Sequence, residues 1–178
     1  MFFTLLLLAA VGAQAQQLPD YTMNPGDALD VSVWKEPDLT KTVAVRPDGK
    51  FSFPLAGEVV AVGHTVTQLQ TEIANRLKKY IPDPVVTVAL SGLDGNRVFV
   101  IGQVNKPGAF VMNPRLTVLQ ALSLAGGMTA FAATNDIIVL RGAAGQQHAL
   151  PFQYGDIAKG RHLEKNISLD AGDVIIVP

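Results

Sequence analysis

Two carboxylates that flank one predicted turn are the best candidates for acid–base chemistry in this chain. Asp48 and Glu58 stand on either side of a hairpin pattern, and glycoside cleavage requires such a pair. Asp48 belongs to Pro47-Asp48-Gly49, however, where its side chain can bond the backbone two residues further on, and Glu58 follows a strand break at Gly57. Local structure accounts for both residues, so we expect no glycoside cleavage and no enzymatic activity.

The side chains that usually bind metals are scattered along the chain. His64, His148 and His162 fall in three different turn or edge segments and lack the spacing of metal ligands. The sequence contains no cysteine, which removes thiolate ligands, disulfides and thiol nucleophiles. No G-x-S-x-G motif is present either. We therefore expect no metal site and no other cofactor.

Two further features have both a binding and a structural interpretation. Gly126-Gly127 could form a phosphate loop, but it follows a predicted helix, whose C-terminal dipole repels anions, so we interpret it as a C-cap. Trp34 ends a predicted strand and could stack on a sugar ring through its flat apolar face. A lone tryptophan in such a place is more often buried, so we favour packing in the core and keep glycan contact as the alternative.

The composition argues against one broad class of partner. The chain has 178 residues, a net charge of -1 and 16% charged residues, below the roughly 25% usual for soluble domains. Such a chain offers no electrostatic footprint for phosphate backbones, so we expect no nucleic-acid partner. Its length suits one domain of ordinary size or two small ones.

The stretch 43–69 has the most informative pattern of elements. Pro47-Asp48-Gly49 predicts a turn between two extended segments, because the glycine supplies a positive φ. Apolar and polar residues alternate after this turn until Pro54, which predicts a strand end or an edge strand. A second apolar strand over 59–62 leads to Thr65, a helix N-cap with a glutamine three residues later. The stretch therefore predicts strand, turn, strand, strand and helix.

The flanking segments continue this alternation of elements. Pro25-Gly26-Asp27 predicts a turn before a half-buried strand over 29–33. After Thr65, an apolar stripe over 66–80 predicts an amphipathic helix that ends at Pro82-Asp83-Pro84. The strand that follows leads into a short flexible joint at 91–96, where we place a domain boundary.

The second half repeats part of the first. Its predicted strands cover 98–104, 109–112, 136–141, 148–152 and 174–177, the last of them a central strand that closes the unit. Thr117-Val118-x-Gln120 matches Thr65-Val66-x-Gln68 at an offset of 52 residues. This echo predicts two related units, each with one helix on a small sheet.

Several motifs together resemble the bacterial polysaccharide export family. They are Tyr21-x-x-x-Pro25-Gly26-Asp27, Val31-x-Val33-Trp34, R-P-D-G-K-F-S-F-P-L-A-G-E-V over 46–59, and G-H-T-V-T-Q-L over 63–69. The second half, with V-F-V-I-G-Q-V-N-K-P-G-A-F over 98–110 and the close over 171–178, looks like the β-grasp module named for soluble-ligand binding. The resemblance implies an α+β fold of two small β-rich units, each a small mixed sheet packed with one helix. We expect an export domain at 20–91 and a β-grasp domain at 96–178.

The resemblance implies structural or assembly roles for the motif residues. In the first half they are Pro25, Gly26, Asp27, Arg46, Pro47, Asp48, Gly49, Pro54, Gly57, Gly63 and Thr65. In the second half they are Gly102, Pro107, Gly108, Gly126, Gly127, Gly172 and Asp173.

A function also follows from the resemblance. Members of the family secrete capsular or exopolysaccharide through the outer membrane, so the chain would be a non-catalytic component of a secretion channel, forming an oligomeric passage or adaptor. The implied partners are the polymer, further copies in a homo-oligomeric ring, a separate outer-membrane pore component and an inner-membrane polysaccharide copolymerase. The alternative is a soluble periplasmic module that binds a glycan or a protein.

Residues 1–15 predict an export signal. An uncharged apolar run precedes Ala13-Gln14-Ala15, a small-x-small cleavage site, so we expect a periplasmic location associated with the outer membrane. Larger relatives commonly begin with a lipidated cysteine and continue into a C-terminal amphipathic helix that lines the pore. The sequence shows neither feature, and we expect this chain to depend on a separate pore component.

Overall fold

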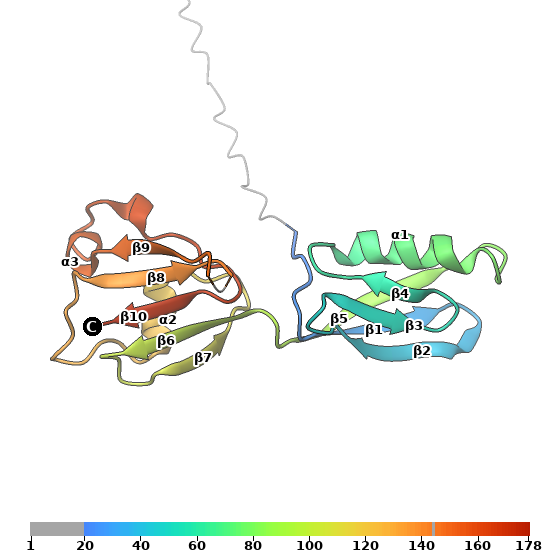
Figure 1. The fold of residues 1–178 in the computed structure, drawn as a ribbon, viewed down its shortest axis with the longest axis horizontal. Coiled ribbons are helices and arrows are strands. Elements are labelled where there is room, and N and C mark those ends of the chain that lie inside the picture. The colour runs from blue at the N-terminus through green and yellow to red at the C-terminus, as the bar shows by residue number, and fades with distance from the viewer. Residues whose placement is uncertain (1–19, 144) are drawn as a thin grey trace, which may run out of the picture.

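The computed structural model describes residues 20–143 and 145–178, so the predicted export signal at 1–15 lies outside the described residues. The described chain forms two β-rich units that lie side by side, joined between β5 (Val86–Leu93) and β6 (Arg97–Gly102) (Figure 1). Each unit has its own cluster of buried apolar side chains. The α+β fold class predicted from the sequence is confirmed.

The first unit combines two antiparallel sheets with one helix. Its other elements are β1 (Asp27–Val33), β2 (Glu36–Ala44), β3 (Lys50–Phe53), β4 (Gly57–Val60) and α1 (Val66–Leu77). A three-stranded sheet has the order β2-β1-β5, and β3 and β4 form a separate hairpin. Buried side chains from both sheets and from the helix, among them Leu29, Phe51 and Ile73, make one core.

Helix α1 begins at the predicted N-cap. The Thr65 hydroxyl accepts the Gln68 backbone N–H at 3.3 Å, and the Gln68 side chain accepts the Thr65 backbone N–H at 2.8 Å. Its buried residues recur every four positions: Leu69, Ile73 and Leu77. Tyr80 was predicted to extend this stripe, and that prediction is wrong. The helix ends at Leu77, and Tyr80 is 61% exposed.

The second unit is built on one mixed five-stranded sheet. Its other elements are β7 (Gly108–Val111), α2 (Val118–Leu124), β8 (Ile137–Arg141), β9 (His148–Phe152), α3 (Tyr154–Ile157), the 3₁₀ turn η1 (Leu163–Lys165) and β10 (Val174–Val177). The strand order is β7-β6-β10-β8-β9, with β10 parallel to β6 and antiparallel to β8. The predicted central position of the last strand is confirmed. Helices α2 and α3 both contribute buried side chains to this core.

The two predicted capping boxes are both present, but the strands before them pair differently. At α2 the Thr117 hydroxyl accepts from Gln120 N–H at 3.4 Å, and the Gln120 side chain accepts from Thr117 N–H at 2.8 Å. Strand β4 pairs only with β3, whereas β7 is the edge of a five-stranded sheet. The sequence echo therefore extends to the helix start and not to the sheet order.

The joint between the units is shorter than predicted. Strand β5 runs on to Leu93, so only residues 94–96 form the connecting turn. The Gly95 backbone N–H donates to the Asp27 carboxylate at 3.1 Å, and the Asn96 side chain donates to the Met112 carbonyl. The joint is thus bonded to the first unit on one side and to the second on the other. Domains at 20–91 and 96–178 stay a prediction.

Candidate functional site

The polar motif of the first unit is positioned by the turn before β3. The Arg46 N–H donates to the Lys50 carbonyl at 2.8 Å, and the Gly49 N–H donates to the Arg46 carbonyl at 2.9 Å. As predicted, the Asp48 carboxylate accepts the backbone N–H two residues on, at 3.2 Å. Gly49 has a φ of +78°, which confirms the turn predicted from Pro47-Asp48-Gly49.

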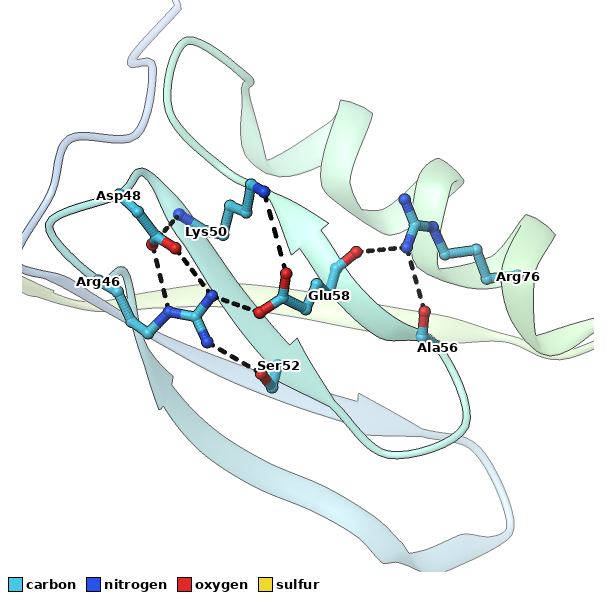
Figure 2. Close-up of polar contacts among 7 residues, drawn as sticks. All are labelled: Arg46, Asp48, Lys50, Ser52, Ala56, Glu58 and Arg76. Atoms are coloured by element: carbon cyan, nitrogen blue, oxygen red, sulfur yellow. Dashed lines mark hydrogen bonds and ion pairs between the residues drawn. The ribbon is translucent and has the colours of Figure 1, made fainter.

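Arg46 lies at the centre of an ionic cluster on the hairpin (Figure 2). Its guanidinium donates to Asp48 at 3.0 and 3.2 Å, to Glu58 at 2.6 Å and to the Ser52 hydroxyl at 3.2 Å. The Lys50 Nζ lies 3.9 Å from the second Glu58 carboxylate oxygen. Two cations and two anions give the cluster no net charge, and its charged side chains are between 40% and 56% exposed.

The cluster fixes the protonation of its two carboxylates. Hydrogen bonds from Arg46 hold the pKa of the Asp48 carboxyl and that of the Glu58 carboxyl below their usual ranges. The same bonds, that to Asp48 first, raise the pKa of the Arg46 guanidinium. A glycosidase needs one carboxyl group with a raised pKa to donate a proton. The structure therefore brings Asp48 and Glu58 together as ligands of one arginine, an arrangement without a general acid.

A second arginine, Arg76 on α1, connects the helix to this hairpin. Its guanidinium donates to the Ala56 carbonyl at 3.1 Å and to the Glu58 carbonyl (Figure 2). Its Nε also donates to the Glu72 carboxylate on the same helix, at 2.7 Å. In the sequence, Arg76 falls outside the apolar stripe of the predicted helix and therefore on its polar side. Its spacing of four from Glu72 indicates the ion pair, but its bonds to the hairpin depend on how α1 packs there.

Asp27 of the first motif is a buried carboxylate held by neutral donors. It is 0% exposed and accepts from the Tyr21 hydroxyl at 2.6 Å, from the Asn24 N–H at 2.8 Å and from the Gly95 N–H at 3.1 Å. Burial, and then the bond to Asp27, raise the pKa of the Tyr21 hydroxyl. The Tyr21 hydroxyl therefore keeps its proton at neutral pH and donates it in the hydrogen bond to Asp27.

Asp173 of the last motif is buried as deeply but is held by a cation. Its carboxylate accepts from Arg141 at 2.6, 3.0 and 3.2 Å and from the Asp170 N–H at 2.9 Å, and it is 1% exposed. The bonds to Asp173 raise the pKa of Arg141, which also pairs with the Asp170 carboxylate at 2.9 Å. Neither Arg141 nor Tyr21 was predicted as a site residue.

The remaining motif positions stand at turns, strand ends or helix ends of both units. They are Pro25, Gly26, Pro54, Gly57, Gly63 and Thr65 in the first unit and Gly102, Pro107, Gly108, Gly126, Gly127 and Gly172 in the second. The predicted C-cap at Gly126-Gly127 is confirmed, because their N–H groups donate to Ser123 and Leu122 of α2. The assembly roles of all these motif residues stay a prediction.

The tryptophan and the histidines lie apart from these clusters. The prediction that Trp34 packs in the core is wrong, because it is 71% exposed at the tip of the hairpin that joins β1 to β2. Glycan contact at Trp34 stays a prediction. His64, His148 and His162 are exposed, and the described residues contain no group of three or more side chains that could hold a metal ion.

Comparisons with known proteins agree with the motifs. Residues 15–91 match the family model described as polysaccharide biosynthesis/export protein, and residues 96–177 match the SLBB domain. The chain belongs to the polysaccharide biosynthesis/export family. The family resemblance predicted from the motifs is therefore confirmed.

Relatives of the polysaccharide biosynthesis/export family match most of this chain. The EPS I polysaccharide export outer membrane protein EpsA of Ralstonia nicotianae is 29% identical over 95% of this chain and 50% of its own length. The capsule polysaccharide export outer membrane protein CtrA of Neisseria meningitidis is 30% identical, over 86% of this chain and 43% of its own. The polysialic acid transport protein KpsD of Escherichia coli is 30% identical, over 74% of this chain and 24% of its own length.

The chain spans half or less of the length of these export proteins. Among the described residues, no helix is both long enough and apolar enough to cross a membrane. The longest described helix, α1, has 12 residues and a polar outer side.

Proposed function

We propose that the chain is a non-catalytic component of a polysaccharide secretion channel, located in the periplasm and associated with the outer membrane. The observation that carries the proposal is the succession of an export match and an SLBB match over nearly the whole chain. Relatives that match 74% to 95% of this chain are named for the export or transport of exopolysaccharide, capsule polysaccharide or polysialic acid. The substrate is accordingly a capsular or extracellular polysaccharide.

The geometry of the hairpin cluster supports a role without covalent chemistry. Its carboxylates are both kept ionised by Arg46, so neither can act as a general acid at neutral pH. The cluster instead bonds β3 to β4, and Arg76 bonds the hairpin to α1. We assign these motif residues to the rigidity of the first unit, and no cofactor is part of the proposal.

Self-association into a ring is the second part of the proposal, and the outer face of the five-stranded sheet supports it. Apart from Arg97 at its margin, the side chains on this face are apolar: Phe99, Ile101, Ala109, Val111, Ile138, Leu140, Ala149, Pro151, Val174 and Ile176. Phe99, Ile101 and Val111 are between 43% and 45% exposed. A contiguous apolar face of this kind marks an interaction site.

A neighbouring copy is the occupant that we assign to this outer sheet face. A charged partner would find almost no complementary charge on it, whereas two copies of a chain with net charge -1 repel each other little. A ring requires a head-to-tail contact, so this face would meet a different surface of the next copy. The ring would receive polymer from an inner-membrane copolymerase and dock on a separate outer-membrane pore component.

The proposed function is tested by deleting the gene in its own host. Loss of surface polysaccharide with intact precursor synthesis is the expected result, and re-expression of the chain should restore the polymer. Unchanged surface polysaccharide would refute the proposal.

Assembly is tested by native mass measurement of the exported protein over a range of concentrations. We expect closed oligomers, and we expect Phe99→Ser with Ile101→Ser to dissociate them. The matched control is Tyr80→Ser with Val85→Ser, which changes two exposed apolar residues outside the outer sheet face. A monomer at every concentration would favour the alternative of a soluble periplasmic binding module.

A further inference from the structure

A cavity of about 440 Å³ lies between the two units, away from the hairpin cluster. The first unit lines it with residues 20–22 and Asn24, before β1, and with Leu90 and Leu93 of β5. The second unit lines it with residues 112–115, before α2, and residues 169–171, before β10. Its volume falls within the ~300 to 1,000 Å³ typical of small-molecule sites.

This cavity combines apolar walls with a polar rim. Met112 and Leu169 are buried, and Leu90 and Leu93 are half-buried, so the apolar side chains occur in both units. The polar lining consists mainly of amide, hydroxyl and carboxyl groups: Asp20, Tyr21, Thr22, Asn24, Asn96, Asn113 and Asp170. Arg115 is the one cationic residue among the residues that line the cavity.

Several of these polar groups keep free hydrogen-bonding capacity. The Arg115 guanidinium lies 3.7 Å from Asp170, whose carboxylate is already paired with Arg141 at 2.9 Å. Arg115 is 57% exposed, and within the described residues the Asn113 side chain has no hydrogen-bond partner. The rim thus offers unused donors from Arg115 and Asn113 next to the carboxylate oxygens of Asp170.

Both walls of the cavity are fixed by the buried aspartates of the family motifs. Asp27 binds the Tyr21 hydroxyl and the Asn24 N–H of one wall. Asp173 binds the Asp170 N–H of the other wall at 2.9 Å. The Gly95 N–H bond to Asp27 holds the joint between the walls. This arrangement keeps the cavity preformed, which lowers the entropic cost of binding a ligand.

We infer that this interdomain cavity binds one or two sugar units of a polysaccharide. A pyranose ring has an apolar C–H face and a rim of hydroxyl groups, which matches apolar walls surrounded by amides, carboxylates and one arginine. A phosphate-rich ligand is disfavoured, because one cation and two carboxylates line the cavity. The inference rests on the proposed function, since it names where the polymer would touch this chain.

The test is a titration of the exported protein, labelled for amide NMR, with maltotetraose and with a hyaluronan tetrasaccharide. These probes separate neutral hydroxyl recognition from recognition of a sugar carboxylate by Arg115. We expect shifts confined to the cavity residues with at least one probe. Asn113→Ala and Arg115→Ala should each weaken binding about threefold to tenfold, the loss expected for one or two hydrogen bonds.

The matched controls are Asn75→Ala and Arg161→Ala, which remove an amide and a guanidinium outside the cavity and should leave binding unchanged. Absence of shifts with both tetrasaccharides would overturn the inference, and so would shifts that the cavity variants leave unaltered. Either result leaves the gene-deletion test of the proposed function intact. Failure of the deletion test, in turn, would show that the chain is not needed for polysaccharide export, and it would leave the binding result unaltered.

Discussion

The two units contain the same turn, X-Gly-Asp, at corresponding places before a strand, but they stabilise its buried carboxylate differently. In each turn the aspartate N–H donates to the carbonyl three residues earlier at 3.1 Å, for both Asp27 and Asp173. Each carboxylate also accepts the N–H of that earlier residue, at 2.8 Å from Asn24 and 2.9 Å from Asp170. The local geometry is therefore shared.

The difference lies in the partners that arrive from elsewhere in the chain. Asp173 receives Arg141 from β8, whereas Asp27 receives the Tyr21 hydroxyl and the Gly95 N–H and, among the described residues, no cation. A buried charge is tolerated when it is either paired or fully hydrogen-bonded. One local motif can therefore use either solution, and each choice binds the turn to a different neighbour.

Removing the cation from the second turn should give the largest effect. Arg141→Met leaves the buried Asp173 carboxylate with one backbone donor, so we expect the free energy of unfolding of the second unit to fall by about 3 kcal/mol. Urea unfolding, followed by hydrogen exchange in the second core, measures the loss. Arg161→Met, which breaks the exposed pair with Asp156, is the control and should cost less than about 1 kcal/mol. Equal losses would show that Asp173 does not need its cation.

Neutralising the first turn should have the next largest effect. An amide at position 27 has one oxygen in place of two, so Asp27→Asn cannot accept from Tyr21, Asn24 and Gly95 as the carboxylate does. We expect a loss of about 2 kcal/mol from the first unit, measured by urea unfolding. Asp30→Asn, at an exposed position of the same strand, is the matched control. A loss no larger than that of the control would contradict the neutral-donor account.

Much of this local structure could be predicted from the sequence, because short motifs determine it. Both threonine caps, the Pro47-Asp48-Gly49 turn and the Pro25-Gly26-Asp27 turn are confirmed, since each depends on residues within a few positions. The burial of Trp34 was predicted wrongly. It enters the tight hairpin turn with Lys35, which has a φ of +64°, and a side chain at a hairpin tip lies beyond the sheet that would cover it.

The partners of the buried aspartates could not be predicted, because they depend on distant pairings. Arg141 lies 32 residues from Asp173, and they meet only because β8 pairs with β10. Gly95 lies 68 residues from Asp27 and reaches it because β5 pairs with β1. The interdomain cavity depends on the same distant contacts, so no spacing in the sequence indicates it.

Alkaline pH should destabilise the turn at Asp27 but not the turn at Asp173, because only the first is bonded to a tyrosine hydroxyl. The expected change in the free energy of unfolding of the first unit is about 1 kcal/mol. The pKa of Tyr21 is raised above its ordinary value of about 10, so its stabilising contribution is complete below the unfolded pKa. That contribution is lost as the pH rises from there through the folded pKa. The first unit should therefore lose less stability between pH 8 and pH 11 in Tyr21→Phe than in the parent protein.

Circular dichroism during urea unfolding at the two pH values measures this loss. Tyr80→Phe, at an exposed position, is the control and should leave the pH dependence unchanged. The same dependence in Tyr21→Phe as in the parent would show that the hydroxyl does not stabilise the first turn.

The smallest predicted difference concerns the two turn glycines. Gly26 and Gly172 have φ values of +96° and +89°, so an alanine at either position costs roughly 1 kcal/mol from backbone strain alone. A Cβ at Gly26 would also lie 3.3 Å from the Gly95 nitrogen, whereas nothing lies within 4 Å of one at Gly172. In Gly26→Ala the backbone of the joint at Gly95 would have to shift to make room for the Cβ. Gly26→Ala should therefore cost about 0.5 kcal/mol more than Gly172→Ala.

This last difference is informative because Gly95 is bonded to Asp27 and lies in the joint between the units. If the joint is rigid, the crowding at Gly26 adds to the strain, and unfolding of the two alanine variants in urea resolves the extra loss. If the joint yields freely, Gly95 moves away and the two variants lose the same stability. Equal losses would therefore contradict a fixed joint, and with it the preformed cavity that the two turns are proposed to hold open.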